Sequence, residues 1–206
     1  MTNYLLRYPH ADRINHWVVA MLFFLAALSG LSFFHPSLFF FSNLFGGGPW
    51  TRILHPFLGV AMALGFVGLY VKFWRDNILT DADRTWNRHL LDLLRGDKGN
   101  MPPAGRYNAG QKAVFWAFTG SLLVLLLTGL VFWRPWFVGY FAIGLIRVAV
   151  VLHAVAAVVL IISVIVHVYA AIWVSGTVRA MTRGTVSESW ARQNHPLWHR
   201  EMTERK

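Results

Sequence analysis

The sequence contains no cysteine, and this absence removes several classes of chemistry. None of its 206 residues is Cys. A chain without thiols cannot ligate an iron–sulfur cluster through cysteine, attach a c-type haem or form a disulfide. Any redox centre that this chain holds must therefore use other ligands.

Charge is scarce as well, and it is absent from four long stretches. Only 14% of the residues are charged, whereas 56% are hydrophobic. A bilayer is crossed by about 20 apolar residues in a helix. We therefore expect an all-α integral membrane protein, a four-transmembrane-helix bundle that forms a single domain over residues 1–206. The charge-free stretches place the spans at about 14–34, 53–72, 112–133 and 147–175. The first is read as a retained helix, because it is long and lacks the small-residue exit of a signal peptide.

The basic residues predict the orientation of these spans. The net charge is +10, but the excess is uneven along the chain. Of the 19 Lys and Arg, only Arg52, Arg134 and Arg147 fall on one side of the predicted bundle. Because basic residues favour the cytoplasmic side, both termini, the loop 73–111 and the tail 176–206 are expected in the cytoplasm. The charge thus reflects membrane topology, and no nucleic-acid partner is expected.

Four histidines lie inside the spans or at their edges. Ionisable groups in a membrane are costly and usually face a partner, a cavity or a cofactor. With alternating span directions, His55 and His153 lie towards the outside, and His16 and His167 towards the cytoplasm. The histidines therefore form two pairs at matching depths. The remaining five are expected at the surface or the membrane interface: His10, His35, His89, His195 and His199.

The helical period strengthens this pairing. His153 and His167 are 14 residues apart, which brings their side chains to within roughly 40° of one another, some 21 Å apart along the axis. Two imidazoles from facing helices are what a six-coordinate haem iron requires. We therefore expect two b-type haems that transfer electrons, since saturated iron has no open position. For a single histidine, a hydrogen bond to a neighbouring helix is the alternative.

Several segments resemble one known family. They are RINHW around His16, RILHPF around His55, GRYNAGQKAVFW from Gly105, VFWRPWF, and VLHAVAAV…VHVYAAIWVSGTVR in the last span. Together they are similar, over nearly the whole chain and in the same order, to the cytochrome b (gamma) subunit of membrane-bound respiratory formate dehydrogenase. The stretch FFFSNLFGGGPW is least similar, and its glycine triplet 46–48 has no place in the family pattern.

The resemblance implies a function and partners. It makes His55 and His153 the ligands of an outer haem b, and His16 and His167 those of an inner one. It implies an iron–sulfur (beta) subunit and a periplasmic catalytic (alpha) subunit with a molybdenum or tungsten pterin, in a bacterial inner membrane. Electrons from formate would reduce a quinone, menaquinone or ubiquinone, near the cytoplasmic face. The family commonly assembles as trimers of such complexes, and this chain alone would not oxidise formate.

The segment RYNAGQK is the candidate quinone site. Asn108 and Gln111 offer amide donors to quinone carbonyls, and Gly110 allows a ring to approach the backbone. An ordinary helix start, with Asn108 as the N-cap, explains the same residues equally well. The family resemblance favours the quinone site.

Two other functions remain open from the sequence. The cytochrome b subunit of a membrane-bound hydrogenase would share the fold and the haems. A transporter or a simple membrane anchor would carry hydrogen-bonded histidines and no haem, although the absence of acidic residues from the spans argues against a proton-coupled carrier. The sequence shows no convincing internal repeat.

Overall fold

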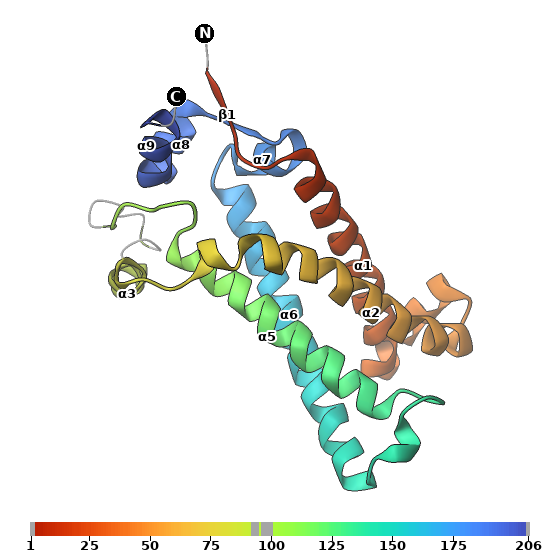
Figure 1. The fold of residues 1–206 in the computed structure, drawn as a ribbon. Coiled ribbons are helices and arrows are strands. Elements are labelled where there is room, and N and C mark those ends of the chain that lie inside the picture. Colours follow the sequence, from red (N-terminus) through yellow and green to blue (C-terminus); the bar gives the residue numbers. More distant parts are fainter. Residues whose placement is uncertain (1–2, 92–94, 96–100, 205–206) are drawn as a thin grey trace. The chain divides into compact units, whose positions relative to one another are not determined.

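The protein is built almost entirely of helices. The computed structural model describes residues 3–91, 95 and 101–204 (Figure 1). Two short strands near the chain ends accompany the helices. In chain order the elements are β1 (Tyr4–Leu6), α1 (His10–Phe34), η1 (Pro36–Phe45), α2 (Gly48–Phe73), η2 (Arg75–Asn77), α3 (Asp81–Arg88), α5 (Ala109–Phe132), η3 (Val138–Tyr140), α6 (Ile143–Trp173), α7 (Thr177–Arg183), β2 (Thr185–Ser187), α8 (Glu188–Asn194) and α9 (Pro196–Glu204).

Four helices account for the charge-free stretches of the sequence. Among the described residues, α1, α2, α5 and α6 are long and apolar enough to cross a membrane, with 25, 26, 24 and 31 residues. Only 11–17% of their most apolar segments is buried. Helices that are apolar all round are typical of membrane spans, because lipid solvates their outer faces. The predicted all-α architecture with four spanning helices is thus present, with α2 starting earlier than expected, at Gly48.

The glycine triplet makes the turn between η1 and α2. Gly46 and Gly47 have φ values of 86° and 92°, a conformation that strains any residue with a Cβ. The amide of Gly47 donates to the Ser42 carbonyl at 2.9 Å, and the Thr51 hydroxyl donates to the Gly47 carbonyl at 2.8 Å. The triplet therefore has a local structural role that the sequence alone did not reveal.

The described chain forms two compact units. Unit 2 comprises residues 14–71 and 117–165, and its core draws on all four long helices. Helices α1 and α2 approach closely at two glycines: an added Cβ at Gly65 would lie 2.8 Å from Val19, and one at Gly68 would lie 2.9 Å from Asn15. Close packing at small residues is how membrane helices associate. The buried core residues are Ala26, Met62, Phe66, Leu122 and Leu160.

Unit 1 joins the two ends of the chain. It comprises residues 1–13, 72–116 and 166–206. Strand β1 pairs antiparallel with β2, with Leu5 opposite Val186, and α7, α8 and α9 complete the core around this pair (Figure 1). Arg7 is only 3% exposed, and its guanidinium lies 4.3 Å from the centre of the Trp198 ring, a cation–π contact. Within the predicted tail 176–206, the described residues 176–204 are thus a folded part of the protein.

His195 lies in this core, and the expectation that it lies at the surface is wrong. It is 2% exposed, its Nδ1 lies 2.8 Å from the Gly105 carbonyl oxygen, and its ring packs against Trp190. Burial lowers the pKa of His195 to about 4, helped by the positive charge of Arg7. His195 is therefore neutral at pH 7 and donates its Nδ1 proton to the Gly105 carbonyl.

Candidate functional site

Two of the four span histidines meet in unit 2. His55 on α2 and His153 on α6 have ring centres 6.2 Å apart, with their planes inclined at 70°. These are the two residues that the depth argument paired as the outer histidines. On α6, the buried residues Ala149, Ala156 and Leu160 recur at helical spacing around His153. The imidazole thus lies on the packed side of its helix.

A hydroxyl group on α1 holds the ring of His55. The Ser29 hydroxyl lies 2.9 Å from Nδ1 of His55 and 3.0 Å from the carbonyl oxygen of Ala26 in its own helix, to which it donates. A hydroxyl has one proton and two lone pairs. Once that proton is donated to Ala26, the Ser29 oxygen accepts the Nδ1 proton of His55, and Nε2 of the ring keeps its lone pair.

The same arrangement occurs on α5 for His153. The Thr128 hydroxyl lies 3.0 Å from Nδ1 of His153 and donates to the Val124 carbonyl at 2.6 Å. Its oxygen therefore accepts the Nδ1 proton of His153. The edge of Phe132 packs on the same imidazole at 5.1 Å between ring centres. Both imidazoles thus carry their proton on Nδ1, which leaves the lone pair of Nε2 for a metal.

A glycine follows each of these hydroxyl residues and lets the ring come close. A Cβ added at Gly30 would lie 3.0 Å from Cε1 of His55, and one added at Gly129 would lie 3.3 Å from Cε1 of His153. Contacts this short force a neighbour to move. With a Cβ at either position the imidazole would have to give way by a few tenths of an ångström, so the two glycines favour the observed ring positions.

The separation of the two rings fits a pair of imidazoles that would hold a single metal ion. With metal–nitrogen bonds of about 2 Å and about 1 Å from each nitrogen to its ring centre, two imidazoles that bind one metal would have centres up to about 6 Å apart. The distance between His55 and His153 is 6.2 Å. Among the residues that the structure describes, no three His, Asp or Glu side chains gather as a metal site. A bis-histidine haem needs only two protein ligands, because the macrocycle supplies the other four.

The other predicted pair is divided between the two units. His16 belongs to unit 2 and His167 to unit 1. The ring of His16 packs edge-on against Trp17, with centres 5.2 Å apart. The neighbouring Asn15 donates to the Gly65 carbonyl at 3.0 Å, which fixes this end of α1 on α2. The pairing of His16 with His167 stays a prediction.

The residues of the predicted quinone site form a helix cap at the start of α5. The Asn108 amide donates to Oε1 of Gln111 at 3.0 Å, and the Gln111 amide donates to Oδ1 of Asn108 at 2.9 Å. These reciprocal bonds are those of a capping box. A Cβ at Gly110 would lie 3.1 Å from the ring of Trp86 on α3. The cap uses the two side-chain oxygens and leaves the side-chain NH2 donors out of its bonds.

A buried ion pair fixes α3 beside this cap. Nζ of Lys112 donates to Oδ2 of Asp83 at 2.7 Å and to the Ile78 carbonyl at 2.9 Å. Burial alone would raise the pKa of Asp83, but hydrogen bonds from Lys112 and Thr80 outweigh it, so this pKa lies below the usual 3.8. In the sequence analysis Lys112 counted only among the basic residues that predict membrane orientation. Its role in holding α3 to α5 was not predicted.

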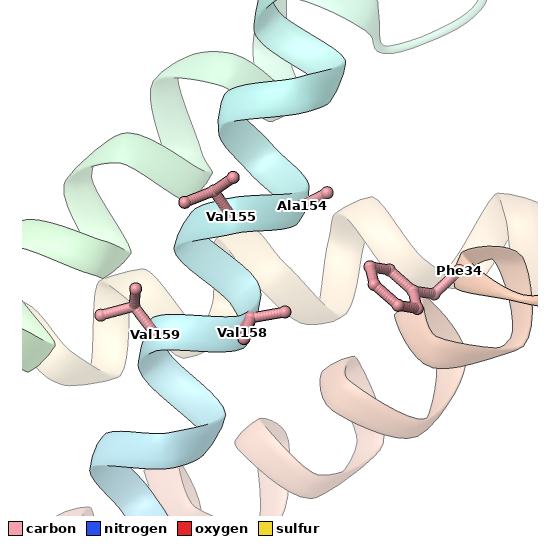
Figure 2. A pocket seen from close by; sticks show the side chains of 5 residues that line it. All are labelled: Phe34, Ala154, Val155, Val158 and Val159. Atoms are coloured by element: carbon pink, nitrogen blue, oxygen red, sulfur yellow. The ribbon is translucent and has the colours of Figure 1, made fainter.

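A shallow apolar depression lies elsewhere on unit 2. It has a volume of about 240 Å³ and is lined by Phe34 from α1 and by residues of α6 (Figure 2). Ligand sites generally combine apolar walls with a few polar groups, and this depression has no polar side chain in its lining. It therefore offers no ligand for a metal. The α6 residues are Ala154, Val155, Val158 and Val159.

A short repeated pattern in the sequence marks the hydroxyl residues that the sequence reasoning missed. Residues 28–31 read LSGL on α1, and residues 127–130 read LTGL on α5. Ser29 precedes its histidine by 26 residues, and Thr128 precedes its histidine by 25. Helix pairs α1–α2 and α5–α6 thus present their imidazoles in the same way. Four residues are too few to stand out in an apolar sequence without the contacts.

Comparisons with known proteins agree on one family. A family model described as "Prokaryotic cytochrome b561" matches residues 7–184. The chain is 42% identical over 198 residues to "Formate dehydrogenase, cytochrome b556(fdo) subunit" of Escherichia coli K12, which covers 96% of this chain and 93% of that protein. Identity to "Formate dehydrogenase, nitrate-inducible, cytochrome b556(Fdn) subunit" of the same strain is 40%, with 96% and 91% covered. "Formate dehydrogenase, cytochrome b556 subunit" of Haemophilus influenzae is 34% identical over 197 residues, with 96% and 83% covered.

Proposed function

Because this chain belongs to the prokaryotic cytochrome b561 family and, within it, to the cytochrome b subunits of formate dehydrogenase, we propose that it carries electrons across the membrane to reduce a quinone. It would receive them from an iron–sulfur partner subunit on the periplasmic side of a bacterial inner membrane. The chain is then the quinone-reducing part of a formate:quinone oxidoreductase. Formate oxidation itself would belong to a separate catalytic subunit with a molybdenum or tungsten pterin.

The observation that carries this proposal is the pair of imidazoles in unit 2. His55 and His153, from two apolar helices, have ring centres 6.2 Å apart, and each has its Nδ1 beside a hydroxyl oxygen. Both rings would therefore have Nε2 available to hold one haem iron. Bound in this way, haem b supplies reversible one-electron transfer without an open site for oxygen. We assign these two residues to the outer haem.

A second haem is proposed for the inner pair. His16 and His167 lie at the other ends of α1 and α6, and the positive-inside distribution of Lys and Arg places those ends near the cytoplasm. The proposal puts both chain termini on that side. The pairing of β1 with β2 supports a common side for the two ends. Two haems in line would let electrons cross the membrane without any proton-carrying side chain in the spans.

The quinone is proposed to bind beside the start of α5. The NH2 groups of Asn108 and Gln111 are donors that the capping box leaves for quinone carbonyls. Gly110 has no side chain, so a ring can approach the backbone at this turn, although the Trp86 ring already lies next to it. A quinone would therefore displace the Trp86 ring or bind beside it. Substitution of Trp86 by Ala should change the KM for quinone if the site is here.

Haem counting on single variants tests the assignment. The measurement is a reduced-minus-oxidised spectrum with a pyridine haemochrome count on the purified complex. Two b-type haems per chain are expected, and His55→Ala and His167→Ala should each remove a different one. His10→Ala, at an exposed position on α1, serves as the matched control and should retain both. One haem in the parent protein would contradict one of the two pairs, and none would remove the electron-transfer proposal.

A further inference from the structure

We propose that the two tetrapeptides LSGL and LTGL position the outer haem ligands and lower the redox potential of that haem. Ser29 and Thr128 are the positioning residues: each accepts a hydrogen bond from the Nδ1 proton of its histidine, His55 or His153. This inference rests on the proposed ligation of one haem by those two histidines. It adds four residues outside the ligand set, on the two helices, α1 and α5, that do not supply the ligands.

The hydroxyl protons decide which way each hydrogen bond runs. Ser29 donates to Ala26 at 3.0 Å, and Thr128 donates to Val124 at 2.6 Å. Neither hydroxyl therefore has a proton left for an imidazole, and both oxygens act as acceptors towards Nδ1. A neutral imidazole with its proton on Nδ1 presents Nε2 to a metal. Each hydroxyl and the glycine that follows it, Ser29–Gly30 or Thr128–Gly129, form what we call a cradle for the imidazole. The cradle thus selects the tautomer with its proton on Nδ1 before any cofactor binds.

The same hydrogen bond changes the ligand's electron donation. An acceptor at Nδ1 draws the proton towards itself and raises the basicity of the ring, and such outer partners tune the metal. A more basic ligand stabilises ferric over ferrous iron, so it lowers the reduction potential. Because His55 and His153 would both hold the same iron, the hydroxyls of Ser29 and Thr128 would act on the same haem and in the same direction.

Gly30 and Gly129 complete the two cradles. Their missing side chains face Cε1 of His55 and of His153, at 3.0 and 3.3 Å from where a Cβ would stand. Cε1 is the carbon between the two ring nitrogens. A methyl group there would push the ring away from the hydroxyl and would displace Nε2 at the same time. The glycine that follows each hydroxyl residue is therefore part of the cradle. Its role there differs from that of the glycines that only allow two helices to pack closely.

Potentiometric titration of the purified complex tests the proposal. Ser29→Ala and Thr128→Val each remove a hydroxyl, whereas Ser29→Thr and Thr128→Ser keep one. Each removal should raise the midpoint potential of the haem that His55→Ala eliminates. A tenfold change in the ferric-to-ferrous ratio is the expected scale, about 59 mV for a one-electron couple. The conservative variants should keep the parent potential, and the second haem should not shift in any of them.

Ser32 provides a matched control for the hydroxyl. It is buried on the same helix, and its hydroxyl donates to the Ser29 carbonyl at 2.6 Å. Ser32→Ala removes a buried hydroxyl that bonds to the backbone of its own helix and to no imidazole. The midpoint potentials of both haems should therefore stay unchanged. For the glycines, Gly129→Ala should broaden or shift the low-spin EPR signal of the outer haem. Gly144→Ala should not, because beyond its chain neighbours and its own helix backbone no described atom lies within 4 Å of its added Cβ.

The outcomes separate the inference from the function on which it rests. Unchanged potentials in Ser29→Ala and Thr128→Val, with both haems bound, would overturn the inference and leave the ligation intact. If His55→Ala retained both haems, the ligand assignment itself would fail. If Ser29→Ala lost its haem, Thr128→Val would decide, because the cradle predicts the same shift from either side of the iron.

Discussion

Replacing Lys112 with methionine keeps most of the side-chain length and removes the charge that holds α3 to α5. Nζ of Lys112 bonds to Asp83 at 2.7 Å and to the Ile78 carbonyl at 2.9 Å. Both charged side chains are only 8% exposed. The substitution leaves a buried carboxylate without its counter-charge, and breaking a buried ion pair in this way costs about 3–5 kcal/mol. We expect α3 to detach from α5 far more often.

Hydrogen exchange of the α3 amides (Asp81–Arg88) measures this opening directly. A loss of about 3–5 kcal/mol corresponds to exchange faster by roughly two to nearly four orders of magnitude. Adding Asp83→Asn to Lys112→Met should recover part of the loss, because no buried charge then stands alone. The asparagine oxygen can still accept the Thr80 bonds that cap α3. A less than additive cost in the double variant is the signature of the pair.

Lys72→Met is the matched control, and it sets the refuting result. Lys72 pairs with Asp12 at 3.8 Å, but their side chains are 54% and 14% exposed, so loss of this pair should cost no more than about 1 kcal/mol. If Lys112→Met changed α3 exchange as little as Lys72→Met changes it around Asp12, the reasoning would be wrong.

Two further predictions concern unit 1. Because burial and Arg7 lower the pKa of His195 to about 4 from 6.5, the unfolded tail binds a proton first as the pH falls. Stability of the tail should therefore be full above pH 6.5 and should decrease down to about pH 4, by up to about 3 kcal/mol. Proteolysis of the tail against pH measures this, and His195→Gln should flatten the profile; a parent profile flat over this range would contradict it. At Gly184, φ is +79° and a Cβ would lie 2.7 Å from the Tyr8 carbonyl oxygen. Gly184→Ala should cost at least about 1–2 kcal/mol and lower the Tm. Gly139→Ala should not, because beyond its chain neighbours and its own helix backbone no described atom lies within 4 Å of the added Cβ. Equal Tm values for the two variants would exclude strain at Gly184.

The spanning helices were predictable because lipid imposes a simple requirement. A segment in lipid must satisfy its own backbone hydrogen bonds and carry little charge, so a charge-free run predicts a helix by itself. The tail was not predictable in the same way. Strands β1 and β2 have three residues each, and each depends on a partner from the other end of the chain. No local pattern in residues 176–206 reports such a contact.

The candidate site divides along a similar line. The pairing of His55 with His153 followed from counting depth along spans, which depends only on topology and length. The roles of Ser29 and Thr128 did not follow, because a hydroxyl in an apolar helix commonly bonds its own backbone. Both do so here, and their second contact depends on the angle at which two helices cross. The prediction that His195 lies at the surface failed for a similar reason. Its hydrogen-bond partner, the Gly105 carbonyl, is 90 residues away in the sequence.

Strand pairing between the two ends of the chain also sets an order for biosynthesis. Leu5 and Val186 lie opposite one another, so the first strand emerges from the ribosome long before its partner exists. At roughly 5–20 residues per second, that wait lasts about 10–40 s. During this interval Leu5 lacks its partner Val186 and Arg7 lacks the Trp198 ring, while the four spans are inserted one after another. The strand pair can close only after β2 has been synthesised. A nascent chain halted within the last span would therefore lack the partner of β1.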